Sequence, residues 1–450
     1  MSYSPVAYQA HTSASGTDDS PDIIATQKNP GYPRRLRIAL LGYRSHPHVG
    51  GQGIYLHYLS KALVDLGHSV EVISGPPYPQ LDPRVPLIKI PSLDLYAHPH
   101  PTRALGVKHL FSFTDVCEWW SKLSGAFGEP YCFGRRLVKY FDRHSPRYDI
   151  VHDNQSLAYG LLDLQKRGVN VVATVHHPIT RDRDLALAAA TGRGHRWLVK
   201  RWYNFLTMQK KVVQGLHHVI TVSTQSQRDI EQAFSRERER IQVIPNGVDT
   251  TIFKPLPHIN RREFSLITTA SSDQPLKGLS VLLRALAQLR AEFPQLTLTV
   301  IGKLKEDGET KKELETLQLS TAVEFKSGIS NEELVEEYAR AEIAVVPSLY
   351  EGFGLPAAEA MACGIPLVCS DGGALPEVVG DAAFMVNAGD VESLSGAVRE
   401  LLLSPPLRAQ FGQRGRAHIL QQLSWDCVGR KMQDFYFQLL DQQRAKNAYH

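Results

Sequence analysis

Two glutamates separated by seven residues, Glu351 and Glu359, are the side chains most suited to chemistry in this sequence. The apolar, β-branched run 343–347 before them predicts a buried strand. Gly352 and Gly354 allow the backbone to turn sharply and approach a ligand, and the helix expected after them directs free N–H groups at whatever lies above the turn. The two carboxylates are therefore placed to hold two ends of one elongated polar ligand. The alternative is that both are ordinary carboxylates on a solvated turn and a helix surface.

With its preceding strand and flanking glycines, this segment resembles the signature of the family-4 retaining glycosyltransferases, which is two glutamates separated by seven residues. The resemblance implies that Glu351 and the backbone of Phe353, Gly354 and Leu355 contact the donor sugar and its phosphates. It also implies that Glu359 holds the ribose hydroxyls. Gly328 and Ile329 occupy the place of the family's loop that contacts the nucleobase.

Lys277 and Gly278 precede an apolar helix predicted over 279–289. A lysine at this point can bind a diphosphate and neutralise its negative charge without a metal, while the glycine lets the backbone adopt conformations closed to other residues. The alternative is an ordinary exposed lysine. The family usually has an arginine six residues before this lysine, and this chain has Ser271 there, so phosphate neutralisation must depend on Lys277, on helix dipoles, or on an arginine elsewhere.

His176 ends an apolar strand predicted over 169–175, and the carboxyl ends of strands face the ligand crevice in open α/β sheets. An imidazole at that position can donate or accept a hydrogen bond near neutral pH. Adjacent side chains of a strand point to opposite faces, so only one of His176 and His177 is expected to face the crevice. The run Thr174-Val175-His176 is similar to the family's Thr-x-His, which implies that His176 lies beside the donor sugar and His177 is the weaker candidate.

A glycine loop over residues 50–53 follows a strand predicted over 37–42 and precedes a helix, an arrangement that cradles phosphate on backbone N–H groups. A dinucleotide fingerprint would need a third glycine where Leu56 stands, so a nicotinamide cofactor is disfavoured. Gly50 and Gly51 match the glycosyltransferase loop that closes on the donor diphosphate and faces the acceptor. The remaining alternative is a plain turn.

Two segments suggest further contacts. The stretch 92–147 is rich in aromatic residues without a regular period, and it is either core and loop packing or a wall that binds the acceptor. The segment 193–214 reads as a helix with an apolar side and a cationic side. Such a helix either docks on anionic lipid or packs on the core with a solvated basic face.

The composition is that of an ordinary globular protein. With 450 residues the chain is too long for one core, and 43% hydrophobic and 21% charged residues fit two α/β domains. A net charge of +4 gives no case for nucleic acid as the main partner. The five cysteines lack metal-ligand spacing, and neither a signal peptide nor a transmembrane run is evident. We therefore expect a cytoplasmic protein, with peripheral contact at the inner membrane face if 193–214 docks on lipid.

Strands and helices alternate along most of the chain. The resemblance, which runs from about residue 37 to residue 440, implies the GT-B fold, in which two Rossmann-like, doubly wound α/β domains face each other across a cleft. The expected parts are a disordered tail (1–33), an acceptor-side domain (34–245), a nucleotide-sugar-binding domain (246–423) and a helix that crosses back to the first domain (424–450).

The resemblance implies a retaining, metal-independent transfer of a hexosyl group from a UDP- or GDP-sugar to a hydroxyl acceptor, with no cofactor. Asp182-Arg183-Asp184 has the spacing of a metal site but follows no predicted strand and lies in the acceptor-side half. Two other classes remain open, because a sugar-nucleotide epimerase and a catalytically silent nucleotide-sugar-binding protein share this architecture.

Overall fold

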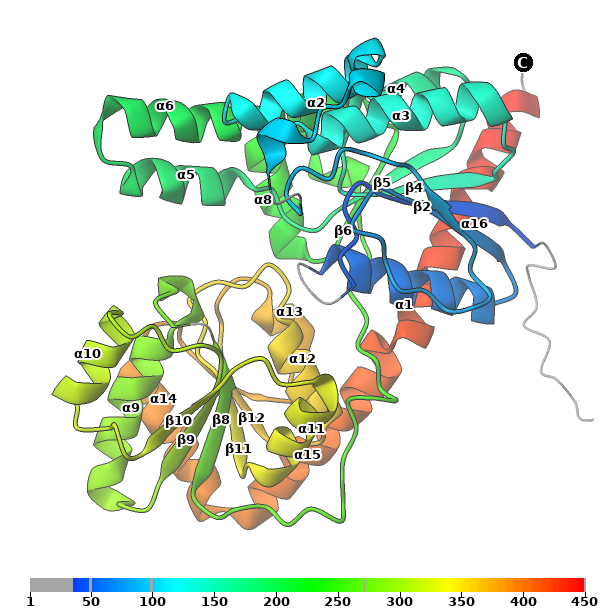
Figure 1. Ribbon diagram of the computed structural model, residues 1–450. Coiled ribbons are helices and arrows are strands. Elements are labelled where there is room, and N and C mark those ends of the chain that lie inside the picture. Colours follow the sequence, from blue (N-terminus) through cyan, green and yellow to red (C-terminus); the bar gives the residue numbers. More distant parts are fainter. Residues whose placement is uncertain (1–34, 48–50, 98–99, 271, 449–450) are drawn as a thin grey trace, which may run out of the picture. The chain divides into compact units, whose positions relative to one another are not determined.

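The computed structural model describes residues 35–47, 51–97, 100–270 and 272–448 (Figure 1). The described residues from Leu36 onward form one compact unit. The expected tail over 1–33, Gly50 of the glycine loop, and Ser271 lie outside the described residues.

The first half of the compact unit contains a seven-stranded parallel sheet in the order β3-β2-β1-β4-β5-β6-β7. The central strands β4 and β5 are buried along their whole length because both faces of a parallel sheet are covered by helices. The strand order reverses between β1 and β4, and ligands of such sheets bind beyond the carboxyl ends of the strands at this point. The strands are β1 (Arg37–Gly42), β2 (Ser69–Ser74), β3 (Leu87–Lys89), β4 (Ile150–Asn154), β5 (Val171–Val175), β6 (His218–Thr221) and β7 (Ile241–Val243).

Helices cover both faces of this sheet. Alternate residues of β1 belong to different core clusters: Ala39 and Leu41 pack with α3, α4, α7 and α8, whereas Ile38 and Leu40 pack with α1 and α16. The helices are α1 (Gln52–Asp65), α2 (Phe113–Leu123), α3 (Glu129–His144), α4 (Tyr159–Lys166), α5 (Thr180–Ala189), α6 (Gly192–Trp202), α7 (Phe205–Gly215), α8 (Thr224–Phe234) and the short η1 (Pro101–Arg103), η2 (Val107–Phe111) and η3 (Arg238–Arg240).

The segment 193–214, predicted as one helix, forms two. α6 buries none of its residues, while α7 buries one face, including Phe205, Met208 and Val212. The turn at Tyr203 and Asn204 separates them. The apolar side expected for a single helix therefore belongs mainly to α7, and it packs in the core rather than facing solvent.

The second half contains a six-stranded parallel sheet in the order β10-β9-β8-β11-β12-β13, again between two layers of helices (Figure 1). Its order reverses between β8 and β11. The strands are β8 (Ser265–Thr269), β9 (Thr297–Ile301), β10 (Val323–Lys326), β11 (Ile343–Val346), β12 (Leu367–Ser370) and β13 (Phe384–Val386). The helices are η4 (Pro275–Lys277), α9 (Leu279–Glu292), α10 (Glu309–Thr316), α11 (Asn331–Arg340), α12 (Leu355–Ala362), α13 (Leu375–Val379), α14 (Val391–Leu403), α15 (Pro405–His418) and η5 (Ile419–Leu423).

The last helix, α16 (Trp425–Ala448), packs against the first sheet. Val428, Met432 and Tyr436 are fully buried there in the cluster that contains α1. The Tyr436 hydroxyl lies 2.5 Å from Nδ1 of His152, a buried residue of β4. The two doubly wound α/β sheets predicted from the sequence are thus confirmed. None of the described helices has the length and apolarity needed to cross a membrane.

Candidate functional site

Lys277 and Glu351 meet where the strand order of the second sheet reverses. Lys277 follows β8 and Glu351 follows β11, and these two strands are paired neighbours. The Lys277 Nζ atom lies 2.8 Å from Glu351 Oε1, and the buried Ser348 hydroxyl donates to the same oxygen at 2.9 Å. An ammonium group and a carboxylate are therefore fixed beside one another beyond the carboxyl ends of two central strands.

Gly278 sets the position of Lys277. Its φ is +66°, a left-handed conformation that favours glycine. A Cβ atom there would lie 1.9 Å from the carbonyl oxygen of Pro347, so any side chain would push apart the two loops that carry the ion pair. The glycine predicted to free the backbone is thus needed for close contact between the β8 and β11 loops.

The segment after Glu351 turns into α12 as predicted. Gly354 is its N-cap with φ +106°, Phe353 is buried, and the Leu355 side chain is 39% exposed. The first N–H groups of a helix have no partner within the helix, so this turn presents donors and a positive dipole end.

Glu359 lies on α12 and is partly buried. Desolvation raises the pKa of its carboxyl to about 7. Within the part of the chain that the structure describes, its carboxyl has no hydrogen-bond or ion-pair partner. A carboxylate at this position has its acceptor capacity available to a ligand hydroxyl.

Gly328 and Ile329 lie beyond β10, at the edge of the sheet. Gly328 has φ +71° with open space around it, and Ser330 caps α11 in a capping box. β10 is two strands from β8, which corresponds to about 10 Å. An elongated ligand that contacts Lys277 therefore spans the sheet edge to reach this loop.

In the first sheet, the amide of Asn154 determines the tautomer of His176. Asn154 ends β4, and its Nδ2 donates to the backbone carbonyl of Gln52 at 2.9 Å. A carbonyl oxygen only accepts, so the amide oxygen must face the other way, where it lies 2.7 Å from His176 Nε2. His176 Nε2 therefore carries the proton, and Nδ1 is left as an acceptor.

His176 is held as a neutral imidazole. Burial, with a smaller contribution from His177, lowers its pKa to about 3. Its backbone N–H donates to Gln155 Oε1 at 2.7 Å, and its ring meets the Tyr55 ring edge to face with centroids 4.7 Å apart. His177 is exposed and lies 3.8 Å from Asp182, so of the two histidines it is His176 that lies in the polar network at the strand ends.

Gly51 is the N-cap of α1 with φ +73°, next to the Gln52 carbonyl that receives the Asn154 amide. The glycine loop and His176 are therefore joined through a single amide. Two serines connect this network to the Glu351 loop. Ser226 Oγ lies 3.1 Å from the carbonyl oxygens of both His176 and Gly352. Ser223 Oγ donates a hydrogen bond to the Gly352 carbonyl oxygen at 2.6 Å.

Sequence reasoning missed Asn154, Ser348 and Ser226 as members of this arrangement. Asn154 is a polar residue at the end of a strand, which was a usable signal because strand ends face the crevice. The tripeptide Asp182-Arg183-Asp184 lies on α5, where Asp184 pairs with Arg183 at 2.8 Å.

Comparison with known proteins identifies the family. Residues 49–252 match Glycosyltransferase Family 4, and residues 256–418 match Glycosyl transferases group 1. The chain is 46% identical over 401 residues to the MMP alpha-(1->4)-mannosyltransferase of Mycolicibacterium hassiacum, covering 87% of this chain and 96% of that protein.

Solved structures share the fold. Sucrose-phosphate synthase of Thermosynechococcus elongatus superimposes with a TM-score of 0.66 at 23% identity, covering 90% of this chain and 100% of that one. Anabaena Alr3699/HepE in complex with UDP and glucose gives a TM-score of 0.62 at 18% identity, covering 89% and 99%. The chain belongs to the family-4, group 1 glycosyltransferases, enzymes of the GT-B fold that transfer sugars.

Proposed function

We propose that this enzyme transfers a mannosyl group from a nucleotide-sugar to a hydroxyl of a mannose-containing acceptor, with retention at the anomeric carbon and without a divalent metal. The observation that carries the proposal is the Lys277–Glu351 pair at the strand-order reversal, in a chain 46% identical to an α-mannosyltransferase. The five cysteines are free thiols, which suits the reducing cytoplasm as the place of this reaction.

In this proposal the second sheet binds the donor. Lys277 and the N-terminus of α12 face the diphosphate, and both supply positive charge where a metal ion would otherwise be needed. Glu359 accepts hydrogen bonds from the ribose hydroxyls. The loop at Gly328 and Ile329 contacts the base. An extended nucleotide whose phosphates lie at Lys277 has to cross the distance of about 10 Å from β8 to β10 to reach this loop. The complexes of Anabaena Alr3699/HepE with UDP and UDP-glucose support a nucleotide-sugar as the donor.

The chemical step is a same-face displacement. The bond between the anomeric carbon and the leaving phosphate oxygen breaks, the acceptor oxygen bonds to that carbon, and the acceptor proton passes to the departing phosphate oxygen. The protein positions the reactants and stabilises the charge that develops on the phosphate. Glu351, fixed by Lys277 and Ser348, contacts the sugar. The Nδ1 lone pair of the neutral His176 accepts a hydrogen bond from a hydroxyl of the same sugar.

A direct test combines the purified enzyme with UDP- and GDP-sugars, with and without a methyl mannoside acceptor. We expect nucleoside diphosphate release that depends on acceptor, an α-linked product by proton NMR, and the same rate after treatment with EDTA. A β-linked product would contradict retention. A new sugar-nucleotide isomer formed without acceptor would indicate an epimerase, and donor binding without turnover would indicate a silent binding protein.

A further inference from the structure

A groove with a strong excess of positive charge lies on the first half of the molecule, outside the site described above. It has a volume of about 720 Å³ and is bounded by the end of β3, by η2 and by α3. Its ionised lining groups are five permanent cations and one carboxylate: Lys89, Lys108, Arg136, Lys139, Arg143 and Asp115. The whole chain carries a net charge of only +4, so this groove concentrates its positive charge.

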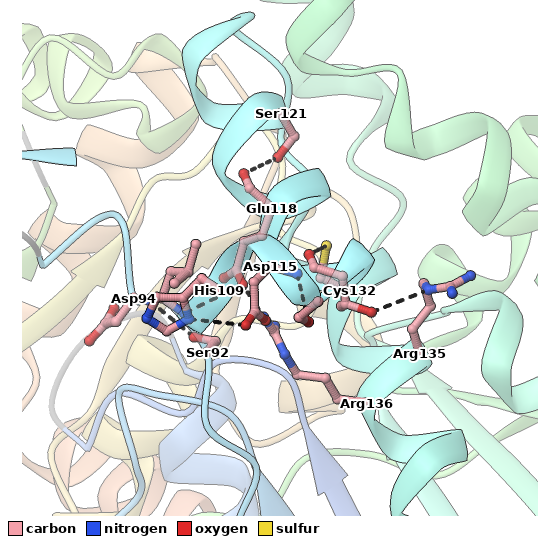
Figure 2. A network of polar contacts seen from close by, with 12 residues as sticks. Ser92, Asp94, His109, Asp115, Glu118, Ser121, Cys132, Arg135 and Arg136 are labelled. Atoms are coloured by element: carbon pink, nitrogen blue, oxygen red, sulfur yellow. Dashed lines mark hydrogen bonds and ion pairs between the residues drawn. The ribbon is translucent and has the colours of Figure 1, made fainter. Parts of the chain in front are cut away.

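The single carboxylate that lines the groove is paired with Arg136. Asp115 accepts a hydrogen bond from Arg136 Nη2 at 2.6 Å and lies 3.1 Å from His109 Nδ1. The same guanidinium lies 2.5 Å from the carboxylate of the buried Glu118. Figure 2 shows these side chains converging between α2 and α3. Asp115 and Glu118 share the single guanidinium of Arg136, so this cluster carries one net negative charge against the four outer cations, and the groove keeps an excess of positive charge.

The outer cations have no acidic partner in the described residues. Lys139 and Arg143 lie four residues apart on one face of α3, and Lys108 faces them from η2. Lys89 stacks over the Tyr78 ring at 5.0 Å without a carboxylate. Like charges gathered around a groove repel one another, so an anionic occupant stabilises this arrangement.

Exposed apolar side chains line the rim of the same groove. In and beside η2, Val107 is 76% exposed, Leu110 59%, Phe111 89% and Phe113 64%. Lys108 and His109, which line the groove, lie between them in the sequence. Four large apolar side chains in seven residues, none of them packed in the core, form a patch of the kind that marks an interaction surface.

We infer that the η2 segment and the cationic groove together form a docking surface for an anionic lipid bilayer. Apolar side chains at the rim enter the interfacial region while the lysines and arginines contact anionic headgroups. A second copy of this chain is a poorer occupant, because it would bring the same cations to the interface. A soluble polyanion is also poorer, because it would leave the apolar side chains exposed to water. The surface differs from the segment 193–214, for which the sequence left both lipid docking and core packing open.

Vesicle flotation of the full chain tests this inference and requires no donor or acceptor. We expect strong binding to vesicles of phosphatidylglycerol and phosphatidylcholine, little binding to phosphatidylcholine alone, and weaker binding at high salt. Phe111→Ser and the double substitution Lys139→Glu, Arg143→Glu should each lower the bound fraction at least tenfold. These side chains are exposed, so folding should be preserved, as checked by circular dichroism.

Two controls alter an exposed apolar residue and an exposed lysine elsewhere. Leu403 on α14 is 54% exposed, and Lys166 on α4 is exposed and lies outside the groove. Leu403→Ser and Lys166→Glu should bind vesicles like the unaltered chain. Equal binding to neutral and anionic vesicles, or unchanged binding by the groove variants, would overturn the inference. A dimer in light scattering that Phe111→Ser dissociates, without vesicle binding, would assign the surface to a second copy instead.

Discussion

Asn154 Oδ1 accepts a hydrogen bond from His176 Nε2 over 2.7 Å, while the nitrogen of the same amide holds the Gln52 carbonyl at the start of α1. One side chain therefore fixes the tautomer of the histidine and holds the first residue of α1. Because Oδ1 only accepts, exchanging the amide for a carboxylate keeps the acceptor toward His176 and adds a negative charge beside the imidazole. The exchange also removes the hydrogen bond to the Gln52 carbonyl, and Asn154→Leu, which lacks the same bond, is the matched control.

Asn154→Asp should introduce an acid limb into the pH profile of kcat. The pKa of His176 is about 3 in the native chain, so its neutral form is constant from pH 6 to 8. A carboxylate at Nε2 stabilises the imidazolium and raises that pKa toward neutrality, so activity should fall as the pH drops below the new value. Asn154→Leu should lower kcat by the same factor at each pH. A pH profile of Asn154→Asp identical to that of the native enzyme would show that the amide does not act through His176.

Lys277→Ala should lower kcat by about 10²- to 10³-fold, because a cation on the leaving phosphate is removed from a preorganised site. Lys277→Arg keeps the charge and should retain part of the activity. The fold should survive, since Lys277 lies on the short η4, none of whose residues is buried in the core. Steady-state kinetics on variants with native circular dichroism check this, and near-normal turnover by Lys277→Ala would exclude it as the phosphate cation.

Glu359→Gln should remove a pH dependence from donor binding. The pKa of the Glu359 carboxyl is about 7, and the ionised form is the better acceptor for ribose hydroxyls. Donor affinity of the native enzyme should therefore rise as the pH increases from 6 to 8. Calorimetric titration of nucleoside diphosphate at three pH values should show this rise for the native chain and a lower, flatter affinity for Glu359→Gln.

The same substitution should stabilise the fold at alkaline pH. A carboxyl whose pKa is raised above its unfolded value of 4.5 destabilises the folded state increasingly as the pH rises from 4.5 through 7. At pH 8 Glu359→Gln should raise the free energy of unfolding by up to about 3 kcal/mol, and at pH 4.5 the difference should be small. Thermal melts at both pH values test the sign of this stability difference. A lower Tm for the variant than for the native chain at pH 8 would contradict the prediction.

Gly278→Ala should destabilise the second half and abolish transfer. Its Cβ would meet the Pro347 carbonyl at 1.9 Å in a left-handed conformation, so the loops carrying Lys277 and Glu351 must separate. We expect a loss of about 2 to 4 kcal/mol in the free energy of unfolding. Gly168→Ala is the matched control, because Gly168 has φ +84° but open space around it, and it should cost only about 1 kcal/mol and leave transfer intact.

The sequence predicted the sheets well because the strands of a parallel sheet are buried on both faces and appear as short apolar runs, such as 343–346. It failed over 92–147 because the aromatic residues there do not share one environment. Phe133 is buried on α3, whereas Phe113 and Trp120 on α2 are exposed, so an aromatic residue in this stretch does not by itself mark a buried face.

The site was predicted only where a motif marked it. Glu351 and Lys277 were recognised from local patterns, but their contact across 74 residues depends on the pairing of β8 with β11, which the sequence does not reveal. Asn154 reaches His176 because β4 pairs with β5 in parallel, with Asn154 opposite Thr174. Such neighbours follow from sheet order and register, and no spacing in the chain encodes them.

Calorimetry with nucleotide-sugars tests most directly the central claim that the second sheet binds an activated sugar through Lys277, Glu351 and Glu359. Titrating UDP- and GDP-sugars into the native chain in EDTA should give saturable heat with at least one donor, and the Lys277→Ala chain should bind that donor at least tenfold more weakly. The absence of heat with every donor, or equal affinity in the Lys277→Ala chain, would contradict the assignment of this pocket.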